Sequence, residues 1–325
     1  MSYSVRLKPS ATVFSAEKGE CILSAALKNN IHLEYSCNAG DCGTCEARLV
    51  AGEVLLNDGS TLTEGPFLTC NSVPLSDLEI EISFFPELSR IQKKTVPAKV
   101  SRCKKITDDV LVLSVRTPPR NGLDYLAGQY VNISYGGVTR SYSIASMKKE
   151  EGELEFHIRY MPYGKMSKLL FNDLQENTLM RLSGPHGTFF VRDSEAPIIF
   201  LAGGTGYAPV KAMVESLIDN NTARRIFIYW GMPFGNMFYC SKPLGWGKNY
   251  NNVDYVPVVS GEDSGWDGRA GFVHQAVLDD FESLAEYHVY ACGSPHMIEA
   301  ARSSFLNQGM NANNFHSDAF TAAKI

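Results

Sequence analysis

The sequence lacks the features that mark several large classes of protein. No apolar run approaches the roughly 18 residues that a membrane-spanning helix requires, so no membrane span is expected. Basic residues are not in excess, because 30 Lys and Arg stand against 35 Asp and Glu, and the formal charge of −5 argues against a nucleic-acid-binding protein. Residues 1–9 carry Arg6 and Lys8 with no apolar core after them, so we expect no secretory signal and a cytoplasmic protein.

What is present is the composition of an ordinary globular protein. The 325 residues are 44% apolar and 20% charged, and a chain of this length usually forms two or three domains. Eight cysteines in a reducing cytosol are not expected to form disulfides. These cysteines therefore need another explanation.

The pattern of apolar residues changes twice along the chain, and it divides the sequence into three domains and a linker. Residues 1–85 indicate a small mixed domain, with short strands around a helix over 20–28 and a loop rich in cysteine and glycine. Residues 86–97 have a proline at each end and a basic patch, which is typical of a linker. We therefore expect the next domain to begin at residue 98.

The two remaining segments predict different kinds of β-structure. Between 98 and 192, short β-rich runs recur with turns between them, which favours an antiparallel barrel with one helix over 166–171. From 193 to 325, continuous apolar strands alternate with helical patterns, which predicts a parallel α/β sheet with helices on both faces. The acidic pair Glu150 and Glu151 is expected in an exposed turn.

Four of the cysteines have a spacing that predicts an iron–sulfur cluster. Cys37, Cys42 and Cys45 form C-x4-C-x2-C, and Cys70 follows 25 positions later, which is the plant-type [2Fe–2S] ligand spacing. The small residues between them, such as Gly40, allow the loop to wrap a cluster and to offer backbone N–H groups to its sulfurs. The alternative is structural thiols or an all-cysteine zinc site, although zinc sites usually combine two C-x2-C pairs.

The barrel segment carries residues that suit a flat, phosphorylated cofactor. In a strand, Arg140 and Tyr142 share one face and Ser143 lies on the other, so a guanidinium could bind phosphate beside a stacking ring. The same pattern also fits an ordinary surface strand. Gly164 to Ser167 should open a helix whose free N–H groups suit a pyrophosphate, and residues 184–189 should form a tight turn.

The α/β segment predicts a dinucleotide site. Residues 203–206 (Gly-Gly-Thr-Gly) lie where an apolar strand meets a helix, and glycines there allow close approach of a pyrophosphate. Cys292 and Gly293 end a later strand, where a buried structural thiol is the alternative. After the second strand no cation occurs before Lys242, so NADH is a better match than NADPH, whose 2′-phosphate needs cations.

Together, the motifs RSYS, GKMS, GPHGTF, GGTGYAP and CGSP resemble the ferredoxin–NADP reductase superfamily. The resemblance implies that Arg140 binds the flavin pyrophosphate, Tyr142 stacks on the isoalloxazine ring and Ser143 bonds the flavin near N5. It implies catalytic positions at Tyr142, Ser143, Cys292 and Phe320, with Phe320 against the flavin from the nicotinamide side. It also implies cofactor-binding positions at Gly164, Met166, Ser167, Gly203, Gly204, Thr205, Gly206, Cys292, Gly293 and Phe320.

Over nearly its full length the chain resembles CDP-6-deoxy-Δ3,4-glucoseen reductases, through segments such as FLAGGTGYAPVKAMVE and GFVHQAVLDDF. That resemblance implies a β-grasp ferredoxin-like domain joined to FAD- and NAD-binding domains. It also implies transfer of single electrons from NADH through FAD and [2Fe–2S] to a pyridoxamine-phosphate-dependent iron–sulfur dehydratase in CDP-3,6-dideoxyhexose (O-antigen) biosynthesis. Reductases of aromatic-ring or alkane oxygenases share these motifs and are the alternative. A non-catalytic iron- or zinc-binding protein is a third possibility, and it would contain no flavin.

Overall fold

The fold is described from a computed structural model, which covers residues 2–149 and 152–321. The predicted acidic turn at Glu150 and Glu151 lies outside the described residues. The described chain forms two compact units, which we call the N-terminal unit (residues 2–92) and the C-terminal unit (residues 93–320). Each unit is described by itself.

The N-terminal unit is a mixed sheet with one helix, as the sequence predicts. Its five-stranded sheet has the order β2-β1-β8-β3-β6, in which β1 and β8 are parallel and the other pairs are antiparallel. A small three-stranded sheet has the order β5-β4-β7. The elements are β1 (Ser2–Lys8), β2 (Val13–Glu17), α1 (Ile22–Lys28), β3 (Glu46–Ala51), β4 (Val54–Leu55), β5 (Thr61–Leu62), β6 (Gly65–Leu68), β7 (Val73–Pro74), β8 (Leu78–Glu81) and the 3-10 helix η1 (Pro86–Arg90).

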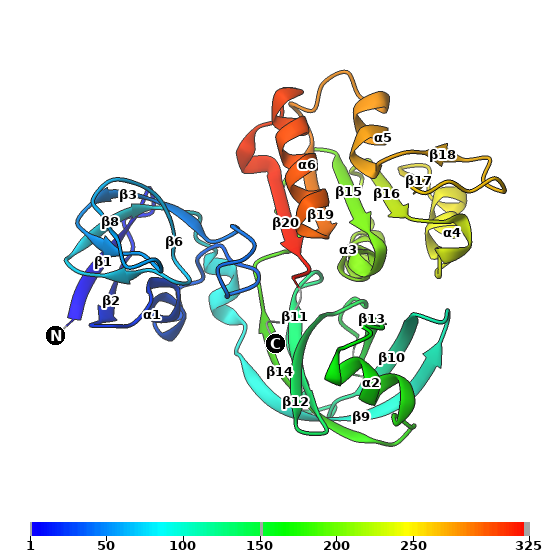
Figure 1. Ribbon diagram of the computed structural model, residues 1–325, viewed down its shortest axis with the longest axis horizontal. Helices are drawn as coiled ribbons and strands as arrows, with labels where there is room; N and C mark the ends of the chain where they lie inside the picture. Colours follow the sequence, from blue (N-terminus) through cyan, green and yellow to red (C-terminus); the bar gives the residue numbers. More distant parts are fainter. Residues whose placement is uncertain (1, 150–151, 322–325) are drawn as a thin grey trace. The chain divides into compact units, whose positions relative to one another are not determined.

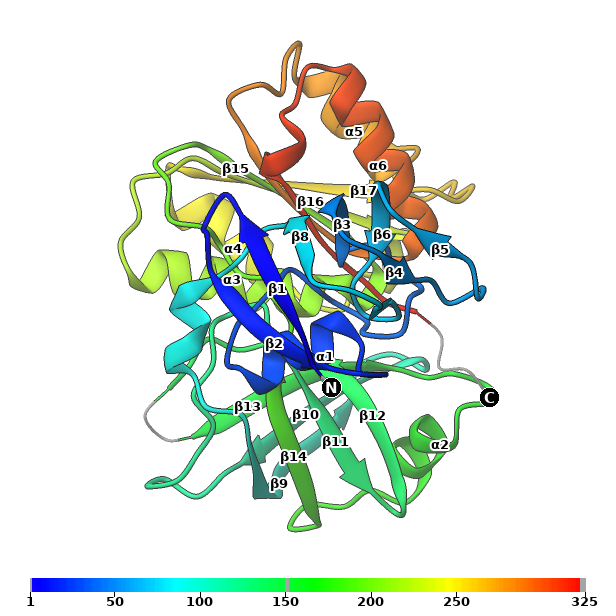
Figure 2. The same ribbon diagram turned by 90° about the vertical axis from the view of Figure 1, so that its left-hand side faces the viewer.

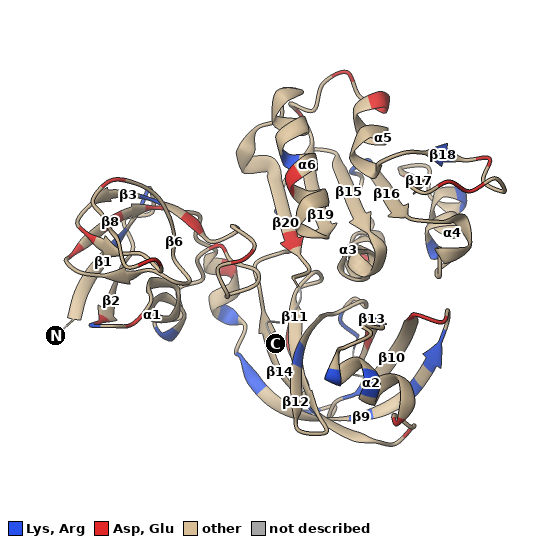
Figure 3. Cartoon of the chain, viewed as in Figure 1, with Lys and Arg blue, Asp and Glu red and all other residues tan. Residues whose placement is uncertain are grey.

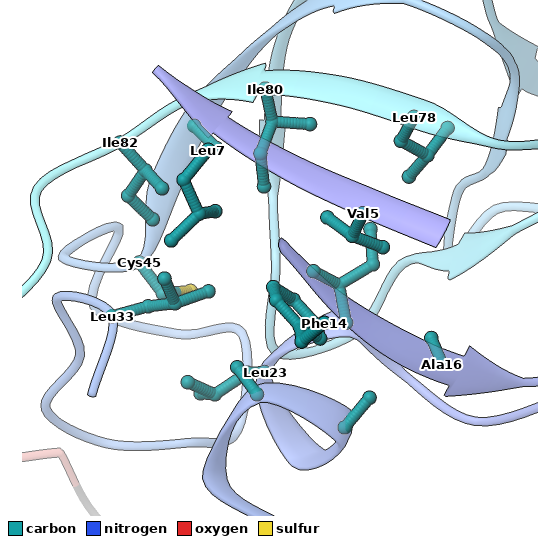
Figure 4. Packing of buried hydrophobic residues seen from close by; sticks show 14 of the residues in the cluster. Val5, Leu7, Phe14, Ala16, Leu23, Leu33, Cys45, Leu78, Ile80 and Ile82 are labelled. Carbon is teal, nitrogen blue, oxygen red and sulfur yellow. The ribbon is translucent and has the colours of Figure 1, made fainter. Parts of the chain in front are cut away.

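The core of this unit follows from the alternation of its strands. Val5 and Leu7 of β1 are fully buried, whereas the residues next to them are exposed, as the period of two of a strand requires. These side chains face Phe14 of β2 and Leu23 of α1, as Figure 4 shows. The amphipathic face of α1 therefore closes one side of the sheet.

The segment expected to be a linker contains regular structure. Pro86–Arg90 forms η1, and Leu88 within it is buried. Lys94 begins the first strand of the C-terminal unit, which pairs with β14 (Leu179–His186), for example Lys94 with Gly184. The proline and the basic patch suggested an irregular chain, but β-pairing satisfies the backbone from Lys94 onward, so only residues 91–93 join the two regular segments.

An antiparallel barrel forms the first part of the C-terminal unit. Its six strands have the order β12-β11-β14-β9-β10-β13, and Ala145 N–H donates to the Glu155 carbonyl at 2.7 Å where the two outer strands approach. Figure 1 shows α2 beside these strands. The elements are β9 (Lys94–Lys105), β10 (Val110–Arg116), β11 (Tyr130–Tyr135), β12 (Val138–Ser143), β13 (Glu153–Arg159), α2 (Lys165–Asn172) and β14 (Leu179–His186).

The tight turn predicted over 184–189 is wrong in its first half. Gly184 to His186 continue β14, and His186 pairs with Tyr130 of β11. The turn comes at Gly187, whose φ of +84° lies in the left-handed region that favours glycine. The Gly184–Pro185 pair suggested that the turn begins at residue 184. The strand continues through both residues, because a strand tolerates glycine and proline at a bulge.

A parallel six-stranded sheet forms the second part of the C-terminal unit. Its order is β18-β17-β16-β15-β19-β20, and every neighbouring pair is parallel. Its elements are β15 (Ile198–Gly203), η2 (Gly204–Gly206), α3 (Tyr207–Asp219), β16 (Ile226–Met232), η3 (Gly235–Met237), α4 (Lys242–Asn249), β17 (Val253–Val259), β18 (Arg269–Ala270), α5 (Val273–Asp280), β19 (His288–Gly293), α6 (Pro295–Asn307), η4 (Ala312–Asn314) and β20 (Phe315–Ala319).

The strand order reverses direction within this sheet, and ligands of such sheets bind at the carboxyl ends of the strands where this happens. The chain leaves β15 toward β16 on one side and later returns to β19 on the other, which makes β15 and β19 the topological switch point. Right-handed crossovers then place α3 and α4 on one face and α5 and α6 on the other, as Figures 1 and 2 show. Within the described residues, no helix has both the length and the apolarity needed to cross a membrane.

Candidate functional site

The four predicted cluster cysteines lie on two segments of the N-terminal unit. Cys37, Cys42 and Cys45 occupy the loop between α1 and β3, and Cys70 follows β6. Gly40 takes a left-handed conformation with φ of +81°, and a Cβ there would lie 2.5 Å from the Asn71 side chain. The left-handed backbone at this point of the loop favours glycine.

The thiols of these cysteines contact one another as two pairs. Cys37 donates to Cys42, which lowers the pKa of Cys42 to about 5, and Cys70 in the same way lowers the pKa of Cys45. Backbone N–H groups also reach the sulfurs, since Ala39 N–H donates to Cys37 Sγ at 3.4 Å. The two thiols of each pair are thus close enough to bind a metal together as thiolates.

The pairing fits a two-iron cluster better than a single zinc ion. In a [2Fe–2S] cluster, two cysteines bind each iron, whereas a structural zinc site needs four ligands around one point. The chemistry of the four thiols and their contact in two pairs fit the predicted group.

The predicted flavin residues lie on β12, where the alternation of the strand separates them as expected. Arg140 is exposed, and its guanidinium donates to the Thr139 carbonyl at 2.7 Å. Tyr142 packs partly buried against the barrel core, and burial raises its pKa to about 12. Ser143 is buried on the other face, and its hydroxyl donates to Asp318 Oδ2 at 3.4 Å.

The predicted pyrophosphate residues lie at the start of α2. Gly164 is the N-cap residue and has extended backbone. The Ser167 hydroxyl donates to the Met161 carbonyl at 2.8 Å, so this side chain secures the turn before the helix. Met166 is buried in the barrel core, so its side chain serves packing, and only its backbone N–H remains available at the helix start.

The glycine loop after β15 meets the end of β19 at the switch point. Gly204 has φ of +57°, and a Cβ on Gly206 would lie 2.2 Å from the Cys292 carbonyl oxygen. Gly203 is close enough to Gly293 that a Cβ on it would lie 3.9 Å from the Gly293 Cα. The two predicted nucleotide segments are therefore packed together backbone to backbone, and Thr205 between them is buried.

The predicted residues near the nicotinamide also converge here. Cys292 is fully buried, and burial and then the nearby Asp318 carboxylate raise the pKa of its thiol. The Phe320 N–H donates to the Gly293 carbonyl at 2.8 Å, which ties the end of the chain to the loop after β19. The Phe320 side chain itself is 37% exposed, so a large ring is left uncovered beside this loop.

The comparisons with known proteins agree with this arrangement. The 2Fe-2S iron-sulfur cluster binding domain family matches residues 5–75, the oxidoreductase FAD-binding domain family residues 97–191 and the oxidoreductase NAD-binding domain family residues 200–303. Protein RfbI of Salmonella typhimurium is 52% identical over 99% of this chain and 98% of its own. A CDP-6-deoxy-L-threo-D-glycero-4-hexulose-3-dehydrase reductase of Yersinia pestis is 49% identical over the full length of both chains.

A solved structure, the ferredoxin reductase in carbazole 1,9a-dioxygenase, has a TM-score of 0.72 and 27% identity and covers 99% of both chains. The chain belongs to the iron–sulfur flavoprotein reductases. The reductase is therefore an oxidoreductase that uses a [2Fe–2S] cluster, FAD and NADH. The predicted combination of a ferredoxin-like domain, an antiparallel FAD barrel and a parallel NAD sheet is confirmed.

Sequence reasoning missed a set of charged and aromatic residues in the C-terminal unit of the reductase. Lys211 and His157 are almost completely buried, although a lysine in the helix pattern and a histidine in a strand gave no such signal. Each one bonds partners far away in the sequence, Lys211 to Glu155 and His157 to Tyr239. Spacing cannot reveal such pairs, because they form only when the barrel and the sheet come together.

Proposed function

We propose that this reductase passes single electrons from NADH to a pyridoxamine-phosphate-dependent iron–sulfur dehydratase in the biosynthesis of CDP-3,6-dideoxyhexoses of the O-antigen. The observation that carries the proposal is the 49% identity, over the whole of both chains, to a reductase named for a CDP-hexulose 3-dehydrase. The match extends over the iron–sulfur, FAD-binding and NAD-binding regions alike. We infer that the protein works in the cytoplasm, a reducing compartment that suits eight unpaired cysteines.

In this proposal the N-terminal unit holds the electron outlet. Cys37 and Cys42 would hold one iron, and Cys45 and Cys70 the other, because these are the pairs whose thiols contact one another. The Ala39 N–H, which points at Cys37 Sγ, would stabilise the negative charge on the ligand sulfurs. The cluster, with FAD, supplies the redox chemistry in which an electron pair from NADH leaves one electron at a time.

The barrel residues bind and orient the flavin. Arg140 is exposed on β12, so its guanidinium can turn from the Thr139 carbonyl to a phosphate. Tyr142 offers a rigid, partly buried ring for stacking, and Ser143 offers a hydroxyl on the other face of the strand. Gly164, Ser167 and the backbone N–H of Met166 form the helix start that suits the pyrophosphate.

The sheet residues place the nicotinamide nucleotide. Gly203 to Gly206 allow its pyrophosphate to approach the N-terminus of α3, and Thr205 lies within that loop. Cys292, Gly293 and Phe320 border the place where the nicotinamide would meet the flavin. Lys242, the first cation after β16, forms an ion pair with Glu215, which is consistent with a nucleotide that lacks a 2′-phosphate.

The acceptor is tested by reconstitution. Purified reductase and NADH would be mixed anaerobically with a CDP-hexulose 3-dehydrase that carries pyridoxamine phosphate, with its CDP-hexulose substrate. We expect NADH oxidation and 3-deoxygenated sugar only when all components are present. The comparison uses the hydroxylase component of an aromatic-ring oxygenase in place of the dehydrase, since a solved relative serves a dioxygenase. Turnover with the hydroxylase and none with the dehydrase would reject the sugar pathway and leave an oxygenase reductase.

A further inference from the structure

Lys211 lies in the second turn of α3, directly after the glycine loop, and is only 3% exposed. Its ammonium donates to the Ala145 carbonyl at 2.7 Å, and it pairs with Glu155 at 3.1 Å and Glu215 at 3.0 Å. An ammonium has three N–H donors, so three acceptors satisfy it completely. Two of the three acceptors belong to the barrel, whereas Lys211 itself belongs to the sheet.

The contact with Ala145 is made at a functional position of the barrel. Ala145 follows Ser143 by two residues at the end of β12, and its N–H donates to the Glu155 carbonyl at 2.7 Å. Lys211 therefore binds the barrel at the point where the predicted flavin strand meets β13. A shift of this contact would move the backbone next to Ser143.

A second set of contacts leads from Glu155 to the glycine loop. Glu155 Oε1 accepts from His157 Nε2 at 2.9 Å, and His157 Nδ1 bonds the Tyr239 hydroxyl at 3.0 Å. Because a carboxylate can only accept, the proton lies on Nε2, and Nδ1 accepts from the tyrosine. Burial lowers the pKa of His157, which favours the neutral ring that this donor–acceptor order requires.

Tyr239 then packs edge-on against Trp230, with ring centroids 5.0 Å apart. The Trp230 indole N–H donates to the Gly204 carbonyl at 2.9 Å, and its ring stacks on Tyr207 at 4.0 Å. The contacts thus run without a break from the Ala145 carbonyl to the Gly204 carbonyl. We call this series, from Ala145 through Lys211, Glu155, His157, Tyr239 and Trp230 to Gly204, the polar strut.

We propose that Lys211 is a positioning residue for the reaction between NADH and the flavin, because through the polar strut it fixes the flavin strand relative to the dinucleotide loop. The proposal rests on the proposed electron transfer from NADH. Hydride transfer requires the two rings to lie in one narrow geometry, and small displacements of either ring lower the rate steeply. A buried ion network is weak evidence for stability, but it can enforce one specific arrangement.

The test compares Lys211→Met with Lys242→Met. Both variants remove a cation from Glu215, but Lys242 is half exposed and acts on Glu155 only through its charge, whereas Lys211 forms an ion pair with Glu155 directly. We expect Lys211→Met to keep its FAD and to lose at least about tenfold in the rate of flavin reduction at saturating NADH, with little change in KM. The long-wavelength absorbance of the stacked flavin–nicotinamide pair should weaken in parallel, and Lys242→Met should match the wild type in all respects.

Hydrogen exchange provides a readout without NADH. In Lys211→Met, amides of residues 144–149, 152–155 and 203–211 should exchange faster than in the wild type and in Lys242→Met. Unchanged protection of these amides would overturn the proposal. A wild-type flavin that is not reduced by NADH would instead reject the proposed function, and the exchange measurement would still test the proposal. Parallel loss of rate, FAD and melting temperature would also overturn it, because that pattern indicates a merely structural role.

If Lys211→Met does not fold, Tyr239→Phe decides. This variant removes only the hydroxyl that His157 Nδ1 accepts from, and it keeps the ring packed on Trp230. We expect a two- to fivefold lower rate of flavin reduction with the same weakening of the long-wavelength band. A rate and band equal to those of the wild type would reject the polar strut.

Discussion

The two units hold their functional residues in different ways. In the N-terminal unit, three of the four predicted iron ligands lie within nine consecutive positions, and a single tight loop presents them. In the C-terminal unit, Ser143 and its partner Asp318 are 175 positions apart, and long-range contacts bring them together. A local loop can be recognised from spacing, whereas a site assembled from distant segments depends on the whole fold.

The two units also differ in charge. Residues 1–92 contain twelve Asp and Glu and six Lys and Arg, so this unit carries the negative charge of the protein, and the remainder is close to neutral. Figure 3 shows basic residues on β9, β12 and α2 of the barrel. The C-terminal unit has exposed ion pairs, such as Arg225 with Asp254, and also the buried pairs of Lys211, whereas most ion pairs of the N-terminal unit are exposed. We therefore expect substitutions in the N-terminal unit to change electron transfer through the cluster, and substitutions in the C-terminal unit to change flavin reduction and stability.

The largest separable effect is expected for Cys42→Ser. Serine is a poor ligand for iron in place of a thiolate, so the cluster should be lost or severely depleted, and reduction of acceptors served by the cluster should fall at least about 100-fold. Reduction of a dye that takes electrons directly from the flavin should remain within about twofold of the wild type. Iron content, visible spectra and the two assays on one preparation measure this.

A matched control for Cys42→Ser is Cys103→Ser, a half-buried thiol of the barrel. It should retain the iron and both activities. If Cys42→Ser keeps a full complement of iron and both activities, Cys42 is not a cluster ligand.

In the C-terminal unit the corresponding test is Gly206→Ala. The new Cβ would lie 2.2 Å from the Cys292 carbonyl oxygen, and because the atoms that it meets belong to the backbone, the glycine loop must move. We expect about a 100-fold lower rate of flavin reduction by NADH, with the cluster spectrum unchanged. Gly245→Ala is the control, since nothing lies within 4 Å of a Cβ there and alanine favours the helix. Equal rates in the two variants would contradict the close packing of the loop against β19.

These tests concern positions that the sequence predicts from short local patterns. The spacing of Cys37, Cys42 and Cys45 and the glycine loop after β15 are short patterns whose chemistry depends on neighbouring residues. The strand alternation around Arg140 and Tyr142 was likewise readable, because a strand fixes the faces of its side chains. The general architecture followed from the change between short β-runs and alternating strands and helices.

The remaining features depend on contacts that no pattern encodes. Lys211 lies in a helix where a lysine normally reaches solvent, and only the barrel placed against α3 turns it into a buried ion pair. The continuation of β14 through Gly184 and Pro185 was missed, because strand pairing overrode the turn preference of those residues. Helix propensity and turn preferences predict local structure poorly where tertiary contacts determine it.

A smaller effect is expected for Tyr142→Ala in the barrel. Loss of the stacking ring should weaken FAD binding by about tenfold, since aromatic stacking contributes roughly 0.5–1.5 kcal/mol beyond the area that it buries. The measurement is the FAD retained after gel filtration and the dissociation constant of FAD from titration of the apoprotein. Tyr163→Ala, at a tyrosine that is 91% exposed, is the control. If both variants bind FAD equally well, Tyr142 does not stack on the flavin.

The last comparison concerns how the stability of the C-terminal unit depends on pH. Burial opposes ionisation of Glu155, yet the hydrogen bond from His157 and the charge of Lys211 lower its pKa to about 2, from 4.5. A group whose pKa is lower in the folded state stabilises the fold above its unfolded pKa. This contribution, at most about 3 kcal/mol, is therefore lost as the pH falls from 4.5 toward 2. The difference in unfolding free energy between wild type and Glu155→Gln should shrink over that range.

The measurement is urea unfolding of the apoprotein followed by tryptophan fluorescence. All three tryptophans, Trp230, Trp246 and Trp266, lie in the C-terminal unit, so the signal reports that unit alone. Carboxylates that both proteins share cancel in the difference, which leaves the contribution of Glu155. A difference that stays constant from pH 7 to pH 3 would mean that Glu155 does not carry its charge against Lys211. In that case the two units would not differ in how they use buried charge.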